Sequence, residues 1–315
     1  MISDFEGEES MICPLKNLNS EKVKYWINGV SNHIISKKQN SQITLKKFPI
    51  SLEEYQPAFE LVRTNILLGN SFLTNLTCAT EIELNINLHE IFERSEARYK
   101  VLLDDKFVCF SPEIFVQIDE FGKISSFPMK GTIDATIPDA ENIILTDKKE
   151  FYEHTTIVDL IRNDISKVAN EVWVEKFRYI DKIQTSDNKE ILQVSSQVSG
   201  LLSNDWQQNL GDTIYALLPA GSISGAPKDK TLAIINEAEK YTYSTRFGEV
   251  GYRRGFYTGI CGIFDGKIFD SGVMIRFIEK TENGLVYKSG GGITARSSAE
   301  NEYQEMIQKI YVPII

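Results

Sequence analysis

Short runs of apolar and β-branched residues, separated by tight turn signals, constrain the fold of this chain more than any other feature. In the first half of the sequence they occupy residues 71–78, 99–103, 107–110, 114–118 and 123–126. Asp104 and Asp105 stand between two of these runs, where a hairpin needs its loop. Antiparallel strands can be joined by such short loops, whereas parallel strands need long crossovers. The pattern therefore predicts antiparallel sheets.

Helical segments are interspersed among the strands without regular βαβ alternation. Ser51 and Glu54 have the spacing of a capping box, which opens a helix that Gly69 ends. Further helices are expected at residues 147–168, 228–240 and 299–311, and further strands at 257–264, 267–278 and 285–289. This order is typical of an α+β fold. We predict a single integrated domain over residues 1–315.

Composition excludes several classes of function. A net charge of -10 without any basic run argues against nucleic-acid binding. The four cysteines lack CxxC spacing, so neither a disulfide framework nor a zinc site is expected. Three histidines favour neither a three-His metal site nor a Ser-His-Asp triad. Residues 1–9 do not form a secretory signal, and no run of about 20 apolar residues could span a membrane. We expect a cytoplasmic protein.

Lys130 is the first candidate for chemistry, in the turn-like segment 127–132. A lone lysine in a turn is most simply a solvated residue. To act as a nucleophile its amine must be neutral, which requires burial or a neighbouring cation. Glu113 precedes a strand nearby in the sequence. It would serve as a general acid if it were protonated and shared a pocket with Lys130.

Three glutamates are candidate metal ligands. Glu153 falls four residues before Ile157, on the apolar face of its helix, although a helix-dipole acid is the simpler explanation. Glu302 and Glu305 are spaced i,i+3, so both point the same way, as many solvated pairs do. Together these glutamates supply the one or two carboxylates that Mg²⁺ typically takes from a protein.

Two glycine-rich segments are candidate ligand sites. Residues 219–228 form a turn that enters a helix, and such a turn presents backbone N–H groups to an anion. A purely structural turn is equally compatible. Residues 290–292 are three consecutive glycines, which either let a ligand approach the backbone closely or mark a bulge.

Arg276 lies in an apolar run that we expect to be a strand. By alternation it shares a face with Met274 and points inward, where a substrate carboxylate or a structural ion pair would satisfy its charge. Tyr257, in the preceding strand, offers a phenolic hydrogen bond, although a tyrosine in a strand is more often a packing residue.

Five segments of this chain, taken together, resemble the chorismate-utilising enzymes, and among them most nearly component I of the aminodeoxychorismate synthases. They are Ser111-Pro112-Glu113, Pro128-Met129-Lys130-Gly131-Thr132, Ile157-Val158-Asp159-Leu160-Ile161-Arg162-Asn163-Asp164, Gly221-Ser222-Ile223-Ser224-Gly225-Ala226-Pro227-Lys228 and Gly290-Gly291-Gly292-Ile293. The resemblance extends from about Ser51 to Ile310. It implies an α+β fold in which antiparallel sheets form a sandwich core with helices packed outside.

The resemblance also implies a ligand set. Mg²⁺ would be held by Glu153 and Glu305, with Glu302 close by, and would grip a carboxylate of chorismate. The implied substrate-binding residues are Gly131, Thr132, Ser224, Tyr257, Arg276, Gly290, Gly291 and Gly292. Metal, guanidinium and backbone N–H groups would then divide the two carboxylates of the substrate.

Within the family, the residue at position 130 selects the reaction, because aminodeoxychorismate synthases carry lysine there. The implied mechanism has Lys130 attack C2 of chorismate while the C4 hydroxyl leaves with help from Glu113. Ammonia then adds at C4 and expels the lysine. The product, 4-amino-4-deoxychorismate, would feed 4-aminobenzoate and folate synthesis. We expect a glutamine amidotransferase subunit to supply ammonia, because no cysteine here stands in a nucleophile-elbow context.

Several positions depart from the family pattern. Leu73 occupies the place of the water-activating lysine of isochorismate synthases, and Gln193 replaces a histidine linked to pyruvate elimination in anthranilate synthases. Residues 1–50 are too few for a tryptophan-binding extension, and residues 241–252 have no assigned role. Two alternatives remain open: an anthranilate synthase component I in which Lys130 is an unusual variant, and a catalytically silent chorismate-binding subunit.

Overall fold

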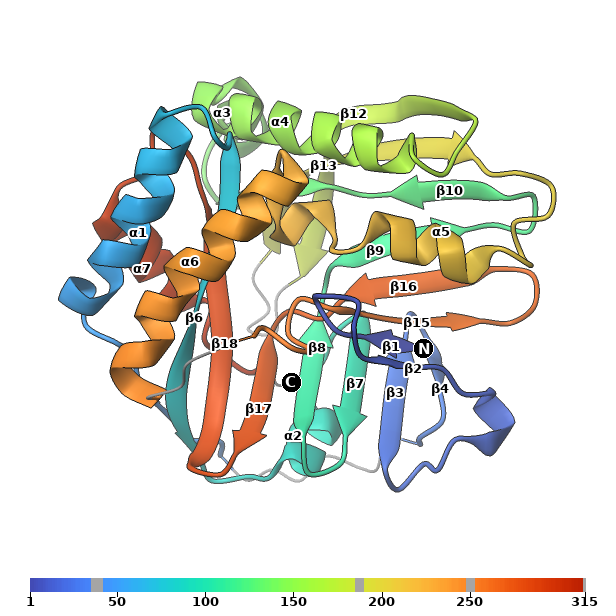
Figure 1. Cartoon of the computed structure of the whole chain (residues 1–315), viewed down its shortest axis with the longest axis horizontal. Coiled ribbons are helices and arrows are strands. Elements are labelled where there is room, and N and C mark those ends of the chain that lie inside the picture. Colours follow the sequence, from blue (N-terminus) through green and yellow to red (C-terminus); the bar gives the residue numbers. More distant parts are fainter. Residues whose placement is uncertain (35–41, 185–189, 248–252, 314–315) are drawn as a thin grey trace. The chain divides into compact units, whose positions relative to one another are not determined.

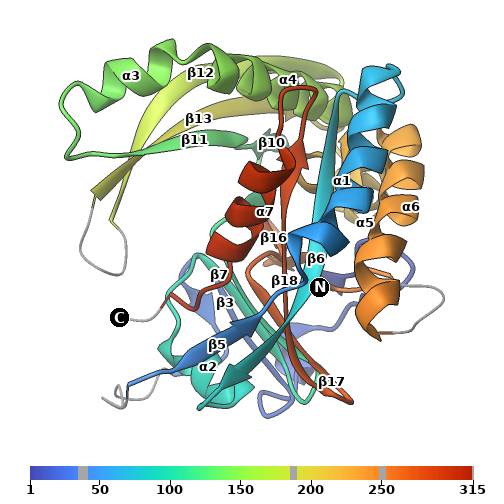
Figure 2. The same ribbon diagram turned by 90° about the vertical axis from the view of Figure 1, so that its left-hand side faces the viewer.

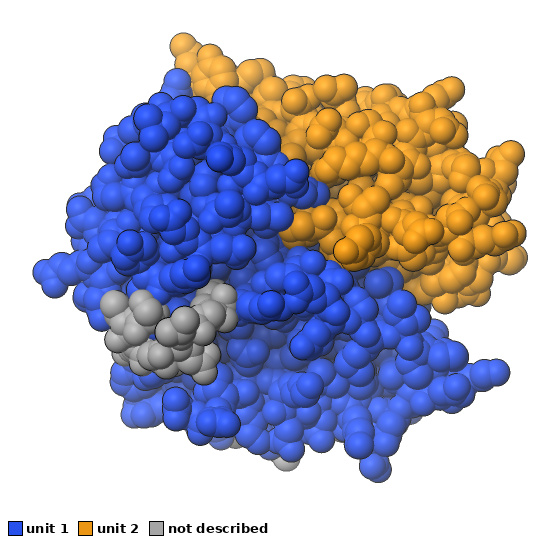
Figure 3. Space-filling model, in the orientation of Figure 1, with its two compact units in different colours: residues 1–113, 223–261, 272–314 blue, residues 114–222, 262–271, 315 orange. Residues whose placement is uncertain are grey.

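Figure 1 shows the computed structural model of the chain. It divides into two compact units, which Figure 3 colours separately. The structure describes residues 1–34, 42–184, 190–247 and 253–313. Unit 1 contains residues 1–113, 223–261 and 272–314, and unit 2 contains residues 114–222 and 262–271. Each unit combines antiparallel strands with helices, which confirms the α+β class. The single integrated domain stays a prediction.

Unit 1 is built on a nine-stranded sheet with the order β14-β6-β18-β17-β8-β7-β3-β4, to which β5 adds beside β6. Its strands are β3 (Val23–Ile27), β4 (Val30–Ser31), β5 (Leu45–Phe48), β6 (Leu73–Leu84), β7 (Tyr99–Leu103), β8 (Phe107–Ser111), β14 (Gly225–Ala226), β17 (Phe277–Thr281) and β18 (Gly284–Ile293). All of these pairs are antiparallel. The expected hairpin at Asp104 and Asp105 joins β7 to β8, where Leu103 faces Phe107.

Helices α1, α6 and α7 pack around β6 and β18 of this sheet (Figure 2). The helices of unit 1 are α1 (Leu52–Leu67), α2 (Leu88–Arg94), α6 (Lys228–Phe247), α7 (Ala299–Gln308) and the 3₁₀ turn η1 (Leu15–Asn17). Ser51 and Glu54 form the predicted capping box at the start of α1. Tyr55, Phe59 and Val62 of α1 join one buried apolar cluster with residues of β6, α6 and α7. Ile293, the last residue of β18, belongs to the same cluster.

Unit 2 carries a second antiparallel sheet in which β13 pairs with β10, β11 and β12, and β10 pairs with β9. The strands are β9 (Ile114–Ile118), β10 (Lys123–Ser126), β11 (Met129–Asp134), β12 (Glu171–Gln184) and β13 (Glu190–Leu201). The helices are α3 (Ala140–Thr146), α4 (Lys148–Ile165) and α5 (Leu210–Leu217). Figure 2 shows α3 and α4 lying along β11 and β13, and the apolar face of α4 (Ile157, Leu160, Ile161) is buried as predicted.

The remaining elements complete the chain. They are β1 (Ile2–Ser3), β2 (Ser10–Met11), β15 (Ile260–Phe264), β16 (Phe269–Val273) and the 3₁₀ turn η2 (Gly221–Ile223). In unit 1, β1 pairs with Ile260 and Cys261 of β15 and with β2. Residues 241–247, which had no assigned role, continue α6, while 248–252 lie outside the described residues. Of the helices that the structure describes, none is long and apolar enough to cross a membrane.

Two predicted strands are wrong at the positions that matter most. Tyr257 lies in a turn before β15, not in a strand, and Arg276 lies in a bend between β16 and β17. The expected alternation of Arg276 with Met274 therefore does not apply. Both errors have one cause: Thr258 and Arg276 have positive φ angles of 62° and 54°, which apolar periodicity does not reveal.

Candidate functional site

Lys130 lies in β11 of unit 2, where pairing with β13 shifts register between Met129 and Thr132. It is thus a strand residue and not the turn residue that the sequence indicated. Its ammonium donates a hydrogen bond to Oε2 of Glu153 at 2.9 Å, and the two side chains are 27% and 10% exposed. Gly131 has a φ angle of 84°, which glycine adopts without strain and which accompanies the register shift.

Glu150 is a second carboxylate at this place that sequence analysis missed. A Cβ atom added to Gly131 would lie 3.0 Å from Oε2 of Glu150, so this carboxylate packs directly on the glycine. Burial, and next to it the charge of Glu153, raise the pKa of Glu150. The signal was present in the i,i+3 spacing of Glu150 and Glu153, which is also the spacing of Glu302 and Glu305.

His154 lies on α4, next to Glu153, and is fully buried. Its Nε2 lies 2.6 Å from Oγ of Ser196, which also accepts a hydrogen bond from the backbone N–H of Arg178 at 2.9 Å. Burial, and next to it the charge of Arg178, lower the pKa of His154 to about 4, so the imidazole is neutral near pH 7. Sequence analysis did not single out this residue.

Gln193 on β13 lies directly opposite Thr132 of β11. The departure from the family histidine therefore falls on the strand beside Lys130. An amide at this position offers hydrogen bonds but does not carry a proton as an imidazole does.

The three glycines of unit 1 lie within β18, in regular register with β6, so the alternative of a bulge is wrong. Gly290 faces Thr77, Gly291 faces Leu76 and Gly292 faces Asn75. A Cβ atom on Gly290 would lie 2.2 Å from the carbonyl oxygen of Leu76, so no side chain fits there. The need for glycine at this position is therefore a matter of strand packing.

Glu302 and Glu305 converge on Gly291. A Cβ atom on this glycine would lie 3.2 Å from Oε2 of Glu302 and 3.6 Å from Oε1 of Glu305. Ser297 donates a hydrogen bond to Glu302 at 2.7 Å, and Lys309 lies 2.7 Å from Glu305. Nζ of Lys309 lies 3.8 Å from the same Cβ position and donates to the carbonyl oxygen of Gly290 at 2.9 Å, so an ammonium stands beside the two carboxylates. Carboxylate oxygens are the ligands that Mg²⁺ prefers.

Arg276 is held in a left-handed backbone conformation that costs a bulky residue of the order of 1–3 kcal/mol. Its guanidinium carbon lies 5.1 Å from the ring centre of Tyr311. Its Nε is buried and has no hydrogen-bond partner among the residues that the structure describes. A buried donor of this kind costs free energy unless something accepts from it. A carboxylate would satisfy it.

Tyr257 is buried beside a second strained residue, and its ring centre lies 5.9 Å from that of Phe277. Thr258 has a φ angle of 62°, an outlier for a β-branched side chain. Two backbone hydrogen bonds tie this turn to Met274, from Thr258 N to Met274 O at 2.8 Å and from Met274 N to Gly259 O at 2.7 Å. The strained turn at Tyr257 is thus tied to the chain just before Arg276.

Ser224 is fully buried, and its carbonyl oxygen accepts a hydrogen bond from the backbone N–H of Asn75 at 2.8 Å. The next residue, Gly225, approaches β6 so closely that a Cβ atom would lie 1.9 Å from the carbonyl oxygen of Leu73. Leu73 itself is buried and apolar. The glycine-rich segment is therefore part of the sheet of unit 1 at this point.

Glu113 is half-buried and is the last residue of the first of the three segments that form unit 1. Its backbone N–H donates to Oγ of Ser111 at 3.1 Å, and its carbonyl accepts from Val273 N at 3.0 Å. These two hydrogen bonds fix the backbone of Glu113, and so fix the point from which its side chain extends.

The predicted site residues are shared between the two units. Lys130, Gly131, Thr132 and Glu153 belong to unit 2, and all the others belong to unit 1. The structure brings Lys130 to Glu153, and Glu302 and Glu305 to Gly291. In the described part of the chain, no group of three or more His, Cys, Asp or Glu side chains is arranged to hold a metal ion. The Mg²⁺ site stays a prediction.

Comparison with known proteins places the chain in a family. The model of the chorismate binding enzymes matches residues 6–314. An uncharacterised "PabA-like" protein of Haemophilus influenzae is 50% identical over 99% of this chain and 90% of its own length. One of Pasteurella multocida is 48% identical over 99% of this chain and 92% of its own length. Aminodeoxychorismate synthase component 1 of Bacillus subtilis is 29% identical over 84% of this chain and 55% of its own length.

Solved structures agree with this result. Anthranilate synthase component I of Streptococcus pneumoniae superposes with a TM-score of 0.68 at 26% identity, over 86% of this chain and 59% of that chain. The menaquinone-specific isochorismate synthase of Escherichia coli gives 0.67 at 17% identity, over 88% of this chain and 64% of that one, a likeness of fold alone. With its fold and family model in agreement, this chain belongs to the chorismate binding enzymes and is related to component I of aminodeoxychorismate and anthranilate synthases.

Proposed function

We propose that this protein is component I of an aminodeoxychorismate synthase, which converts chorismate and ammonia to 4-amino-4-deoxychorismate. The observation that carries the proposal is the half-buried Lys130, held at 2.9 Å from Glu153 on a strand whose register shifts at the lysine. An amine in this position is partly shielded from water, yet 27% of the side chain remains open to a substrate.

The proposed reaction consists of two displacements. The ammonium of Lys130 first gives a proton to its partner Glu153. The resulting neutral amine forms a bond to C2 of chorismate, the ring double bonds shift, and the C4–O bond breaks as Glu113 gives a proton to the departing hydroxyl. Ammonia then bonds to C4, the double bonds shift back, and the bond from C2 to Lys130 breaks. One hydroxyl is replaced by one amino group, water is released, and the enolpyruvyl ether stays intact.

In this proposal, hydrogen-bond donors of unit 1 bind the substrate. Arg276 would give its buried Nε–H to a carboxylate of chorismate, which resolves an otherwise costly orphaned donor. Tyr257, Ser224 and the backbone of Gly290–Gly292 would contact the ring and the second carboxylate. Gly131 and Thr132 of unit 2 would contact the substrate beside Lys130.

Mg²⁺ is part of the proposal, because Glu302 and Glu305 offer converging carboxylates over Gly291. Glu153, in unit 2, is the third proposed ligand. Bound Mg²⁺ would supply a positive charge that holds a carboxylate of the substrate. Ser297 and Lys309 orient the two carboxylates of unit 1 by hydrogen bonding and charge.

We further propose that ammonia comes from a glutamine amidotransferase partner. Three of the four cysteines are buried and Cys13 is exposed near residue 1, and none stands in a nucleophile-elbow sequence. With purified protein, ammonium salts should then support turnover whereas glutamine alone should not. Turnover with glutamine alone would contradict this part of the proposal.

The deciding experiment is mass spectrometry of chorismate incubated with the purified protein, Mg²⁺ and ammonium at mildly basic pH. We expect a product in which an amino group replaces a hydroxyl, without release of pyruvate. Anthranilate together with pyruvate would instead establish anthranilate synthase activity. This is the second candidate, because some relatives are named anthranilate synthase component 1. Unchanged chorismate, with ammonium present, would support a silent chorismate-binding subunit.

A further inference from the structure

Arg254 is an enclosed cation of unit 1 that the proposed reaction does not use. Its side chain is 1% exposed, and that of its partner Glu239, on α6, is 3% exposed. Nε lies 3.2 and 3.1 Å from the two carboxylate oxygens, and Nη2 lies 2.7 Å from Oε1. The ring of Phe5 covers the guanidinium, with its centre 4.5 Å from the guanidinium carbon. The pair is therefore shielded from solvent and from any substrate.

The same guanidinium holds two backbone segments that carry candidate substrate residues. Nη1 donates to the carbonyl oxygen of Ile223 at 2.8 Å, and Nη2 donates to that of Asn75 at 2.7 Å. Ile223 directly precedes Ser224. Asn75 lies opposite Gly292 in the pairing of β6 with β18. One planar group thus links the glycine-rich turn to the strand beside the three glycines.

The other contacts of the pair lead to the same site. Glu239 accepts hydrogen bonds from N and Oγ1 of Thr77 at 2.9 and 2.7 Å, and Thr77 lies opposite Gly290. Nη1 of the guanidinium lies 3.4 Å from Oγ1 of Thr258, the strained residue that follows Tyr257. The turn that presents the phenol is therefore braced by the same pair.

We propose that Arg254 and Glu239 are a positioning pair, which holds the segments bearing Ser224, Tyr257 and the β18 glycines in a geometry fit to bind substrate. The inference rests on the proposed function, because it takes those residues as substrate-binding. The guanidinium reaches two carbonyls and a carboxylate from three separate nitrogens in one plane, whereas a lysine ammonium presents its donors from a single nitrogen. A buried ion pair often adds little net stability, so its contribution here lies in the geometry that it selects.

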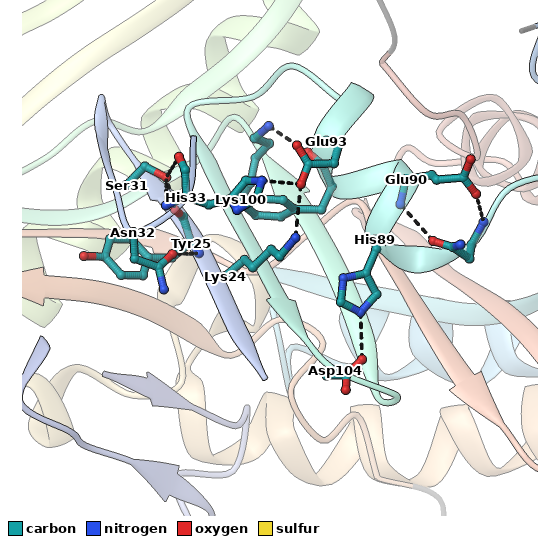
Figure 4. Close-up of polar contacts among 12 residues, drawn as sticks. Lys24, Tyr25, Ser31, Asn32, His33, His89, Glu90, Glu93, Lys100 and Asp104 are labelled. Atoms are coloured by element: carbon teal, nitrogen blue, oxygen red, sulfur yellow. Dashed lines mark hydrogen bonds and ion pairs between the residues drawn. The ribbon is translucent and has the colours of Figure 1, made fainter. Parts of the chain in front are cut away.

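Two variants and one control test the pair. Arg254→Lys keeps the charge and loses the fork. Arg254→Met/Glu239→Leu removes both charges, an exchange that buried pairs often tolerate without unfolding. The control is Lys100→Met: Lys100 is 2% exposed in unit 1, but donates to the carbonyls of Phe92 and Ser95 at 2.8 and 2.9 Å. Lys100 lies beside the ion pair of Lys24 and Glu93 (Figure 4).

The first measurement is hydrogen–deuterium exchange of the ligand-free proteins. We expect residues 220–227 and 255–261 to exchange roughly tenfold faster in both Arg254 variants, while the control matches the parent there. Unchanged exchange in these segments, or equal acceleration by Lys100→Met, would overturn the inference. This result does not depend on the identity of the substrate, so it stands even if the proposed function fails.

The second measurement is the Kd for chorismate with Mg²⁺ present, at a temperature where all variants are folded. We expect about a tenfold or greater rise in Kd for both Arg254 variants, because displaced binding groups lose affinity steeply, and less than about twofold for the control. Equal Kd values in parent and variants would reject the positioning role. A parent that does not bind chorismate would reject the proposed function alone, and the exchange result would then decide the pair.

Discussion

Two ion pairs, one in each unit, differ in what surrounds them. The Arg254–Glu239 pair of unit 1 is 1% and 3% exposed, and its hydrogen bonds reach two backbone segments, the turn at Ile223 and strand β6. The Lys130–Glu153 pair of unit 2 is 27% and 10% exposed, and a second lysine, Lys149, lies 3.8 Å from the same carboxylate. An enclosed pair can only hold its neighbours in place. A half-open pair can exchange partners and protons, as chemistry requires.

The largest effect should come from removing the open lysine. We expect Lys130→Ala to lower kcat for amination at least about a thousandfold while chorismate still binds, because the nucleophile is lost and the binding groups remain. Lys149→Ala is the matched control, since Lys149 contacts the same Glu153 and is 53% exposed. Its kcat should stay within about twofold of the parent, as expected for a surface pair. Normal turnover of Lys130→Ala would end the nucleophile assignment.

Substitution of two adjacent glycines of β18 should have different effects, one on stability and the other on ligand binding. Gly290→Ala would place a Cβ atom 2.2 Å from the backbone oxygen of Leu76, so we expect a loss of about 2–4 kcal/mol in the free energy of unfolding. Gly291→Ala meets side-chain carboxylates at 3.2 Å or more, which can move, so the fold should survive.

The two glycine variants should also differ in chorismate binding. Gly291→Ala should weaken Mg²⁺-dependent chorismate binding by about tenfold, because it displaces Glu302 and Glu305. Denaturant titration measures the first effect and calorimetry the second. If both variants were equally unstable, or if Gly291→Ala bound normally, the proposed division between the two glycines would be wrong.

His154 should make the stability of the chain depend on pH. Its pKa in the folded state is lowered from 6.5 to about 4, so the folded state favours the neutral ring. The stabilisation is fully present above pH 6.5 and is lost as the pH falls towards 4, and the loss by pH 4 amounts to about 3 kcal/mol. Denaturant titrations of the parent and His154→Gln from pH 7 to pH 4 should therefore converge by that amount. Parallel curves would mean that His154 titrates normally.

The smallest effect concerns one carboxylate of α7. We expect Glu305→Gln to raise the Mg²⁺ concentration for half-maximal activity by about tenfold, because an amide binds Mg²⁺ more weakly than a carboxylate does. Glu300→Gln is the control, since Glu300 is exposed on the same helix. A metal titration of Glu305→Gln that overlays the parent would remove Glu305 from the proposed site.

Local features of the fold were predictable because short-range sequence determines them. The capping box of Ser51 and Glu54, the hairpin at Asp104 and Asp105, and the buried face of α4 all follow from spacing within a few residues. The strained turn at Tyr257 and the bend at Arg276 were missed, because neighbouring strands hold them and their own residues favour extended backbone.

The candidate site was likewise predictable only in those features that short-range sequence determines. The residue types and their order led to the chorismate binding family, which the family model confirms over residues 6–314. The partner of each charge did not follow from the pattern. Glu153 is 23 residues from Lys130, and Asn75 is 179 residues from Arg254. Glu150, His154 and Arg254 were accordingly missed as residues of interest.

By itself the sequence determined most of the element types, the family and the candidate reactive residues, because turn propensity, periodicity and motif order are properties of the sequence. Only the tertiary structure decided that Lys130 lies on a strand with Glu153 as its partner, that Glu302 and Glu305 converge on Gly291, and that a buried guanidinium joins the distant segments at Ile223 and Asn75. Burial and hydrogen bonding depend on which residues distant in the sequence come into contact, and tertiary packing decides those contacts.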